Sequence, residues 1–352
     1  MRVSKVEISS FKKFVNQQSF DFWDHNQYDG SDVTLIVGNN GSGKSSLLQA
    51  IVLVTATATR EHFSAESLDW PGFDHSHIQS GRFPLNIKCT YQFTEEEVAA
   101  TKSYAQELIE KGVQLGVPAE NLEITLAYDH NRQKVNTDLG SNAYYQFSGY
   151  QFAKRLTKYV EQKNELFNRV GDIYWYTEQR TSYSISNTFD VEKPQLDWMR
   201  SFLASAYSFH IAIKEGKRDL KGGQFDFYDA LHKLYKTVFP KRSFVGAAPN
   251  FDAFEKASAP DFFLYDGINQ YEISEMSAGE RAIFPILLDF ARWNINNSII
   301  IIDEVELHLH PPLQQAFVRS LSKLGKNNQF ILTTHSESVT SMFEEEQIIR
   351  LP

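Results

Sequence analysis

The hydrophobic positions near both ends of the chain follow the pattern of an α/β protein. Residues 3–8 and 33–37 are short apolar runs, and the second leads through a glycine-rich turn into an apolar stretch of helical length at 47–58. This order predicts a strand, a loop and a helix. Residues 298–303 and 329–333 are continuous apolar runs typical of parallel strands buried on both faces. We expect the two ends of the chain to share one sheet.

The middle of the chain has a different hydrophobic pattern, with aromatic-rich loops between shorter periodic segments. Its predicted strands lie at residues 85–93, 122–128 and 172–177. Its predicted helices lie at residues 95–115, 151–170, 196–214 and 225–239. The dipeptide Asp266-Gly267 predicts a tight hairpin turn. These changes divide the chain into residues 1–60, an insertion at 61–170, a strand and helical region at 171–265, and a last α/β region at 266–352.

Composition limits the partners and the compartment. The 352 residues include 35 Lys and Arg against 44 Asp and Glu, a net charge of −9, so a nucleic-acid partner needs a local basic patch. The candidates for such a patch, which also fit solvated helix faces, are Lys154, Arg155, Lys158, Lys217, Arg218 and Lys221. The single cysteine, Cys89, excludes an intramolecular disulfide. No segment has the length and apolarity of a membrane span, so we expect a cytoplasmic protein without membrane contact.

Residues 38–45 match the phosphate-binding pattern G-x-x-x-x-G-K-[ST], between a predicted strand and a predicted helix. Glycines let the backbone wrap a phosphate closely, and the helix start adds its positive dipole end. Lys44 is expected to reach the β- and γ-phosphates and Ser45 to hold Mg²⁺, so ATP and Mg²⁺ are the expected cofactors. The predicted nucleotide-binding residues of this loop are Asn39, Asn40, Gly41, Ser42, Gly43, Lys44, Ser45 and Ser46. A chance glycine-rich turn is the alternative, and it is rare in a chain of this length.

Two acidic residues directly follow the apolar run at 299–302. Asp303 suits the shell of a bound Mg²⁺, and Glu304 is placed to orient or deprotonate the attacking water. The plainer alternative is a buried strand that runs into an acidic loop, which is common in α/β proteins. The phosphate-binding pattern in the same chain favours the catalytic interpretation.

Three further segments of the last third carry candidate chemistry. Ser277 and Glu280 have the spacing of a capping box, which by itself predicts only a helix start. His308 and His310 form a His-x-His pair, a weak metal candidate without a clear third ligand. His335 follows a predicted strand and, taken alone, fits an ordinary loop histidine.

In this order, the motifs resemble those of the ATP-binding cassette (ABC) ATPases, and within them the class of the SMC proteins, RecF and the OLD-type bacterial ATPases. The opening residues 6–14 are also similar to the family's first strand and its Phe-basic turn. The resemblance covers roughly the first sixty and the last ninety residues. It implies an α/β ABC-ATPase fold of the P-loop NTPase class, with a mixed sheet split by a globular α+β insertion. Residues 1–60 and 266–352 are then its two ATPase lobes.

The resemblance also implies roles for single residues. It assigns Ser277 and Gly279 to the signature motif, which contacts the γ-phosphate held by the other protomer. It assigns Asp303 to the Walker B motif and Glu304 to the catalytic carboxylate. His335 corresponds to the switch histidine that contacts the γ-phosphate.

Three weaker correspondences complete the predicted site. The segment 308–310 matches the D-loop region, Gln179 stands about where the Q-loop glutamine is expected, and Lys12 matches the family's basic residue near the phosphates. The predicted catalytic residues are Lys44, Glu304 and His335. The predicted Mg²⁺ ligands are Ser45, Asp303 and Gln179.

The sequence departs from the family in three respects. Its signature is Met-Ser-Ala-Gly-Glu where transporters have Leu-Ser-Gly-Gly-Gln. The insertion has no long coiled-coil pattern, which argues against chromosome-scale tethering of the SMC kind. The sequence after the strand near Ile348 leaves no room for the Toprim nuclease domain of OLD nucleases, so we expect any nuclease to be a separate protein.

These observations predict an ATPase that dimerises around ATP, with a larger assembly also open. The chain looks most similar to stand-alone ATPases of the Septu or PARIS type, which predicts a sensor or regulator of a separately encoded effector, a nuclease, in bacterial anti-phage defence. One alternative is a RecF-like ATPase of DNA repair and recombination that acts on DNA. Another is an ATP-dependent scaffold that holds a toxic partner inactive. A scaffold needs ATP bound, whereas an engine needs it cleaved.

Overall fold

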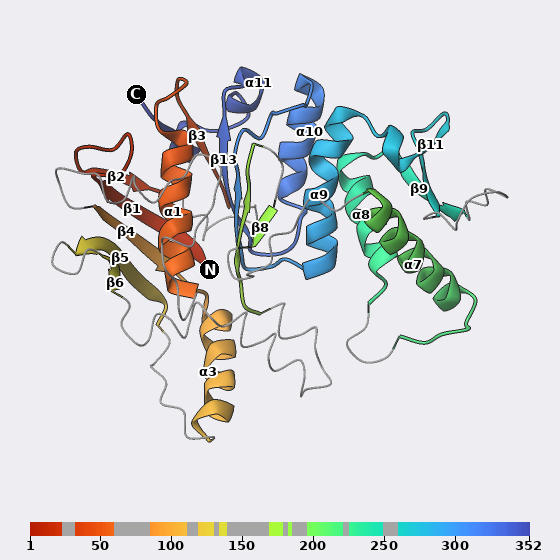
Figure 1. Cartoon of the computed structure of the whole chain (residues 1–352), viewed down its shortest axis with the longest axis horizontal. Coiled ribbons are helices and arrows are strands. Elements are labelled where there is room, and N and C mark those ends of the chain that lie inside the picture. The colour runs from red at the N-terminus through yellow and green to blue at the C-terminus, as the bar shows by residue number, and fades with distance from the viewer. Residues whose placement is uncertain are drawn as a thin grey trace.

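The computed structural model describes residues 1–22, 32–59, 85–110, 119–129, 134–138, 169–178, 182–184, 196–220, 225–248 and 260–352. Within these residues the strands form an antiparallel sheet, a mainly parallel sheet and a small third sheet (Figure 1). No helix of these ranges is long and apolar enough to cross a membrane.

The antiparallel sheet lies at one end of the molecule's long axis (Figure 1). Its strand order is β2 (Gln18–Asp21), β1 (Arg2–Ser9), β4 (Asn86–Gln92), β5 (Asn121–Asp129) and β6 (Lys134–Asp138). Helix α3 (Glu95–Ile109) follows β4. The described strands of the segment 61–170 therefore extend a sheet that begins with β1, while the domain boundaries stay a prediction.

The parallel sheet carries strands from both ends of the chain. Its order is β14 (Ile348–Arg350), β3 (Asp32–Val37), β13 (Gln329–Thr334), β12 (Ile299–Ile302), β7 (Ile173–Tyr176) and β8 (Ser182–Ser184). All neighbours run parallel except β8, which is antiparallel to β7. Because β3 pairs with both β13 and β14, the expected sharing of one sheet is confirmed.

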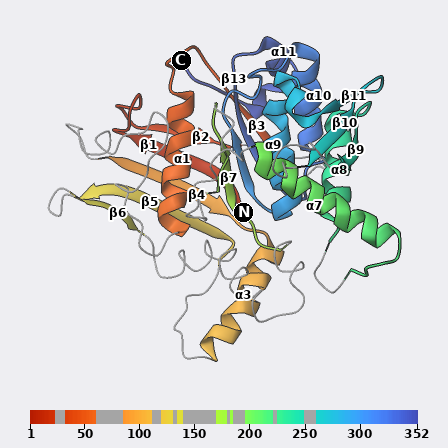
Figure 2. The ribbon, with the colours of Figure 1, turned by 45° about the vertical axis from the view of Figure 1, so that its right-hand side comes forward.

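The continuous apolar runs arise because the parallel sheet is buried on both faces. In β12, Ile299 and Ile301 join the core around helix α1 (Lys44–Thr59), whereas Ile300 and Ile302 join the core on the other face. Figure 2 shows α1 running across the strands of the antiparallel sheet. Its described side chains from Leu47 to Ala56 are buried, as expected for a helix enclosed between two sheets.

The second core lies under the helices on the opposite face of the parallel sheet. The larger elements there are α7 (Leu196–Lys214), α8 (Phe227–Val238), α9 (Ala278–Trp293) and α10 (Pro311–Leu321). The third sheet has the order β11 (Gln270–Glu272), β10 (Asp261–Tyr265) and β9 (Ser243–Ala248). The short helices are η2 (Ile273–Glu275), α11 (Glu337–Thr340) and η3 (Glu345–Gln347).

The predicted hairpin and helices of this region are confirmed. The Asp266 carboxylate accepts hydrogen bonds from the Ile268 and Asn269 amides at 2.7 Å each, and Gly267 has a φ of +104°. This Asx-type turn joins β10 to β11. Helix α7 has the predicted bounds, and α1 begins at Lys44, three residues before the apolar run that predicted it.

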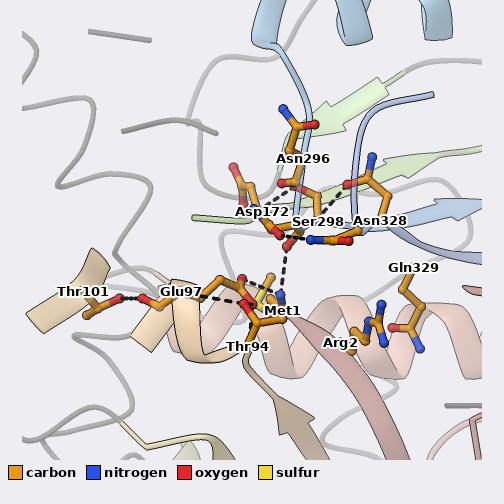
Figure 3. A network of polar contacts seen from close by, with 12 residues as sticks. Met1, Arg2, Thr94, Glu97, Thr101, Asp172, Asn296, Ser298, Asn328 and Gln329 are labelled. Carbon is orange, nitrogen blue, oxygen red and sulfur yellow. Dashed lines mark hydrogen bonds and ion pairs between the residues drawn. The ribbon is translucent and has the colours of Figure 1, made fainter. Parts of the chain in front are cut away.

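A polar network joins the two larger sheets at the amino-terminal ends of the parallel strands (Figure 3). The Met1 amino group donates to the Asn297 carbonyl at 2.9 Å and pairs with the buried Glu97 carboxylate. The Gln329 side chain bonds both the N–H and the carbonyl of Val3 at 2.8 Å. These contacts tie β1 and α3 to the starts of β12 and β13, and leave the opposite, carboxyl edge of the sheet for the site.

Candidate nucleotide-binding site

The candidate site lies at the carboxyl edge of the parallel sheet. Strands β3, β12 and β13 are adjacent and parallel, with Val37 opposite Thr334 and Ile302 opposite Leu332. The loops that leave these strands therefore emerge side by side, which is where α/β sheets place their ligands. This register gathers the phosphate loop, the acidic pair Asp303 and Glu304, and His335 at one edge.

The phosphate loop has the conformation that its glycines allow. Gly41 has a φ of +75° and Gly43 a φ of +107°, both in the left-handed region. A Cβ on Gly43 would lie 3.2 Å from the Phe14 ring and 3.3 Å from the Lys13 Cβ, so the opening turn of the chain abuts the loop. Ser45, at the start of α1, is exposed.

The loop's donors fit a polyphosphate. Asn39, Asn40 and Gly41 are exposed at the tip of the loop, beside the N-terminal end of α1. The Ser42 hydroxyl oxygen is buried and, within the described part of the chain, has no hydrogen-bond partner. An unpaired buried hydroxyl is costly, and a bound phosphate oxygen would satisfy it.

Lys44 links the loop to the acidic residues. It is 6% exposed, and its ammonium donates to the Gly38 carbonyl at 2.9 Å and the Asn39 carbonyl at 3.2 Å. Burial lowers the pKa of Lys44, while the charges of Asp303, Glu304 and Glu306 act in the opposite direction. Lys44 therefore lies within electrostatic reach of the acids that end β12.

A threonine that sequence reasoning missed organises those acids. Asp303 is 2% exposed, and the Thr333 hydroxyl donates to its carboxylate. The same hydroxyl oxygen accepts the Glu304 amide at 2.7 Å. Glu304 has a φ of +48°, a strained conformation for a non-glycine residue that clusters at functional sites. Exposed Ser45 and carboxylate Asp303 supply the oxygen donors that Mg²⁺ prefers.

The loop that follows β13 and contains His335 is held by Glu306, a second residue that the sequence did not single out. Glu306 accepts the Thr334 hydroxyl at 2.7 Å and the His335 backbone N–H at 2.6 Å. The His335 side chain is exposed at the site edge. His310 caps α10 by accepting the Leu313 amide at 3.2 Å. Among the described residues, no cluster of three or more His, Cys, Asp or Glu side chains forms a metal site.

A cavity of about 620 Å³ adjoins the phosphate loop. It is lined by the start of the loop, the end of β13, α11 and β14, and includes Asn39, His335 and Arg350. A Cβ on Gly38 would lie 2.8 Å from the Leu351 carbonyl, so glycine permits the chain after β14 to approach the loop. The cavity opens at the same edge as the loop and belongs to the candidate site.

The structure describes one of the two weaker site predictions, Lys12 and Gln179. The Lys12 ammonium donates to the Gln49 side chain on α1, and burial lowers the pKa of Lys12. The residue that borders Gly43 is Lys13. Gln179 lies outside the described residues.

The basic residues considered for nucleic acid are only partly described. Lys217 and Arg218 are exposed just after α7. The candidates outside the described residues are Lys154, Arg155, Lys158 and Lys221.

The signature segment lies at the start of α9, on the face of the parallel sheet opposite α1 (Figure 1). Ser277 is exposed, and its hydroxyl donates to Glu280 at 2.8 Å in a complete capping box. A Cβ on Gly279 would lie 2.8 Å from the Leu313 side chain and 3.5 Å from the His308 carbonyl. Glycine at this position lets the start of α9 pack against the D-loop region.

Glu280 is a buried carboxylate with several donors. It accepts hydrogen bonds from the Tyr235 hydroxyl at 2.7 Å and from the Tyr271 hydroxyl, and it pairs with the Arg242 guanidinium. Burial alone would raise the pKa of Glu280, but hydrogen bonds from Arg242, the two tyrosines and Ser277 lower it to about 2. The start of the signature segment is therefore held by an acceptor that is ionised at neutral pH.

A family model described as an AAA ATPase domain matches residues 1–340. The chain belongs to the AAA ATPase domain family. It is 25% identical to the Retron Ec83 probable ATPase of Escherichia coli, over 99% of this chain and 71% of that protein. It is 21% identical to the Retron Vc95 probable ATPase of Vibrio cholerae serotype O1 biovar El Tor, over 99% of this chain and 73% of that protein.

Among solved structures, an Smc head bound to the C-winged helix domain of ScpA has a TM-score of 0.55 to this chain. The two are 14% identical, and the match covers 99% of this chain and 94% of the Smc head. The likeness shows the fold and confirms the predicted mixed α/β architecture of an ABC-type ATPase head. Membership in the AAA ATPase domain family implies that the chain binds a nucleotide. None of these matches is to a Septu or PARIS protein.

Proposed function

We propose that this AAA ATPase domain protein binds ATP with Mg²⁺ at residues 38–46 and hydrolyses it. The observation that carries the proposal is the Thr333 hydroxyl, which joins Asp303 and the Glu304 backbone at the edge that Lys44 faces. When bound, Mg²⁺ would neutralise charge on the β- and γ-phosphates. Ser45 and Asp303 would hold the metal ion, with Gln179 as a further proposed ligand.

The positions of the side chains support the remaining proposed roles. Lys44 would bind the β- and γ-phosphates, and the exposed His335 would contact the γ-phosphate. Glu304 would orient the attacking water and accept its proton. The Thr333 bond to the Glu304 amide supports this role, because it fixes the backbone from which the carboxylate projects.

We also propose that the active form is a homodimer with two nucleotides at its interface. Ser277 is exposed at the N-terminus of α9, a helix end that favours an anionic ligand. Helix α9 and the phosphate-binding helix α1 lie on opposite faces of the parallel sheet, which supports contact with a phosphate held by the other subunit. Ser277 and Gly279 would make that contact.

For the biological role, we propose an ATP-driven sensor or regulator of a separately encoded effector in bacterial defence. Support comes from two relatives that align over nearly the whole chain and carry the words "retron" and "probable ATPase" in their names. The effector that we propose is a nuclease, in keeping with the sequence prediction.

Replacing Glu304 by Gln tests the hydrolytic role. Loss of a general base costs about 10²- to 10⁴-fold in turnover, so Glu304→Gln should hydrolyse ATP that much more slowly while it still binds ATP and forms ATP-dependent dimers. Phosphate release and light scattering measure the two properties. The control is Glu346→Gln, the same change at an exposed residue of η3, which should keep the parental rate.

A parental rate in Glu304→Gln would contradict the assignment. The same variant also separates an engine from a scaffold. In cells that carry the complete defence module, a protein that only needs ATP bound would retain its protective effect after Glu304→Gln, whereas the proposed engine would lose it.

A further inference from the structure

The buried carboxylate of Glu280 gathers donors from three parts of the chain that surround the signature segment. Tyr235 comes from α8, Tyr271 from β11, and Arg242 from the turn between α8 and β9. Glu280 is 2% exposed, so these donors replace water around its charge. The Arg242 guanidinium also stacks over the Phe239 ring, 5.2 Å from its centroid, which restricts its orientation.

The signature serine is bound to the same carboxylate. One oxygen of Glu280, Oε2, accepts both the Ser277 N–H at 2.9 Å and the Ser277 hydroxyl at 2.8 Å. The serine hydroxyl proton therefore points back to Glu280, and the backbone that begins α9 is held in one position. The direction in which Ser277 faces a ligand depends on where the Glu280 carboxylate lies and on its charge.

A second ion pair holds the segment that precedes the serine. The Arg200 guanidinium on α7 makes two bonds to the Glu272 carboxylate, at 2.9 and 2.6 Å. Glu272 caps η2, which ends one residue before Met276. Burial would raise the pKa of Glu272, but bonds from Arg200 and Ser274 lower it to about 2. Both sides of the signature turn are thus anchored to the α7–α8 region.

We propose that Arg242 is a positioning residue of the nucleotide site: it holds the Glu280 carboxylate in place, and Glu280 in turn fixes the Ser277 backbone that begins α9, the helix end proposed to face the phosphate of the other subunit. Arg242 acts through Glu280 and does not touch the nucleotide. The proposal rests on the proposed function, since it requires Ser277 to act across a dimer interface.

The pH dependence of turnover separates this role from a purely structural one. The groups that face the Glu280 carboxylate are Arg242, Tyr235, Tyr271 and Ser277. Loss of Arg242 removes one of the contributions that lower the pKa of Glu280, while the burial that raises it remains, so the pKa of Glu280 should rise. A protonated Glu280 no longer accepts both Ser277 donors on one charged oxygen, so turnover should fall as the pH is lowered. The native pair avoids this dependence.

The experiment measures steady-state ATP hydrolysis of the full chain between pH 6 and pH 8.5 in parental protein, Arg242→Gln, Arg242→Lys and the double variant Arg242→Gln/Glu280→Gln. Loss of a charged hydrogen bond costs about tenfold, so Arg242→Gln should turn over about tenfold more slowly at pH 8 and slower again at pH 6. Arg242→Lys keeps the charge but loses the planar guanidinium that stacks on Phe239, so its turnover should lie between those of Arg242→Gln and the parent. The double variant has no carboxylate at position 280 to titrate, so its pH profile should run parallel to the parental one.

Two controls define the effect. Binding of a non-hydrolysable ATP analogue should change by less than about twofold in Arg242→Gln. Arg242 does not touch the nucleotide, so its loss should leave ground-state binding intact. Arg319→Gln makes the same change of charge at an exposed position of α10 and should keep the parental rate and profile.

Parental turnover with a flat pH profile in Arg242→Gln would overturn the proposal. If Arg242→Gln does not fold, the double variant and Arg242→Lys carry the test, and a fall in turnover at low pH that is steeper in the double variant than in the parent would overturn it. Ser277→Ala distinguishes the two levels of inference. If Ser277→Ala keeps ATP-dependent dimers and parental turnover, the proposed function fails. If Ser277→Ala loses both and Arg242→Gln loses neither, only the role of Arg242 fails.

Discussion

The phosphate-binding edge and the signature segment show two ways of building a site. In the phosphate loop, Lys44 bonds Gly38, six positions away in sequence. At the signature, Glu280 bonds Tyr235, 45 positions away. A site made from near neighbours can be recognised as a motif, whereas a site supported by distant partners is visible only once the chain has folded.

The two regions also treat charge differently. At the phosphate loop, burial lowers the pKa of Lys44, and the exposed tip of the loop leaves donors for a ligand. At the signature, Arg242 and two tyrosines satisfy Glu280 within the chain and lower its pKa to about 2. The phosphate loop therefore keeps exposed donors for an anionic ligand. At the signature segment, the charge of Glu280 is satisfied within the chain, and its contacts hold Ser277.

The largest expected effect is on the stability that the Glu280 contacts contribute. Removing one partner of a buried ion pair costs about 3–5 kcal/mol, so Glu280→Ala should lower the free energy of unfolding by that amount. Urea denaturation followed by circular dichroism measures it. Glu346→Ala removes an exposed carboxylate and should change the same quantity by less than about 0.5 kcal/mol. Equal stability of the two variants would show that the Glu280 network contributes nothing to folding.

Lowering the pH should reduce the stability contributed by Glu280 over a defined pH range. The pKa of Glu280 is about 2 in the folded chain against an ordinary value of 4.5, so its contribution is complete above pH 4.5 and is lost as the pH falls toward 2. The difference corresponds to about 3 kcal/mol. Between pH 5 and pH 2 the parent should lose that much more unfolding free energy than Glu280→Gln. Parallel stability curves would contradict the low pKa.

A smaller effect is expected at the phosphate loop. Gly43→Ala places a side chain at a φ of +107° and against Phe14 and Lys13, a strain of about 1–3 kcal/mol. ATP affinity should fall about 10- to 100-fold, as measured by isothermal titration calorimetry. Gly216→Ala is the matched control, because Gly216 also has a positive φ, +66°, with no atom within 4 Å of the added Cβ. Equal ATP affinity in both variants would separate Gly43 from the nucleotide site.

The contrast between partners that are near in sequence and partners that are distant also explains which parts of the fold can be predicted from the sequence. Apolar runs predicted β3, β12 and β13, because strands buried on both faces need apolar residues at every position. The alternation in residues 85–93 predicted β4 but not its partner, since its pairing with β1 spans more than 70 intervening residues. Pairing over such distances leaves no local pattern.

The candidate site follows the same rule. The glycines, Lys44 and the acidic pair after β12 are found by spacing alone, and the structure brings them to one edge. Thr333 and Arg242 were missed because a threonine that ends a strand and an arginine in a turn have no distinctive pattern. Their significance depends on the carboxylates of Asp303 and Glu280, which reach them only in the folded chain.

The most direct test of the account is the structure of Glu304→Gln with ATP and Mg²⁺, determined by crystallography or cryo-electron microscopy. We predict that this structure contains two subunits, with ATP bound between residues 38–45 of one and Ser277 of the other. Nucleotide bound to a lone subunit at saturating ATP, with Ser277 exposed to solvent, would contradict it.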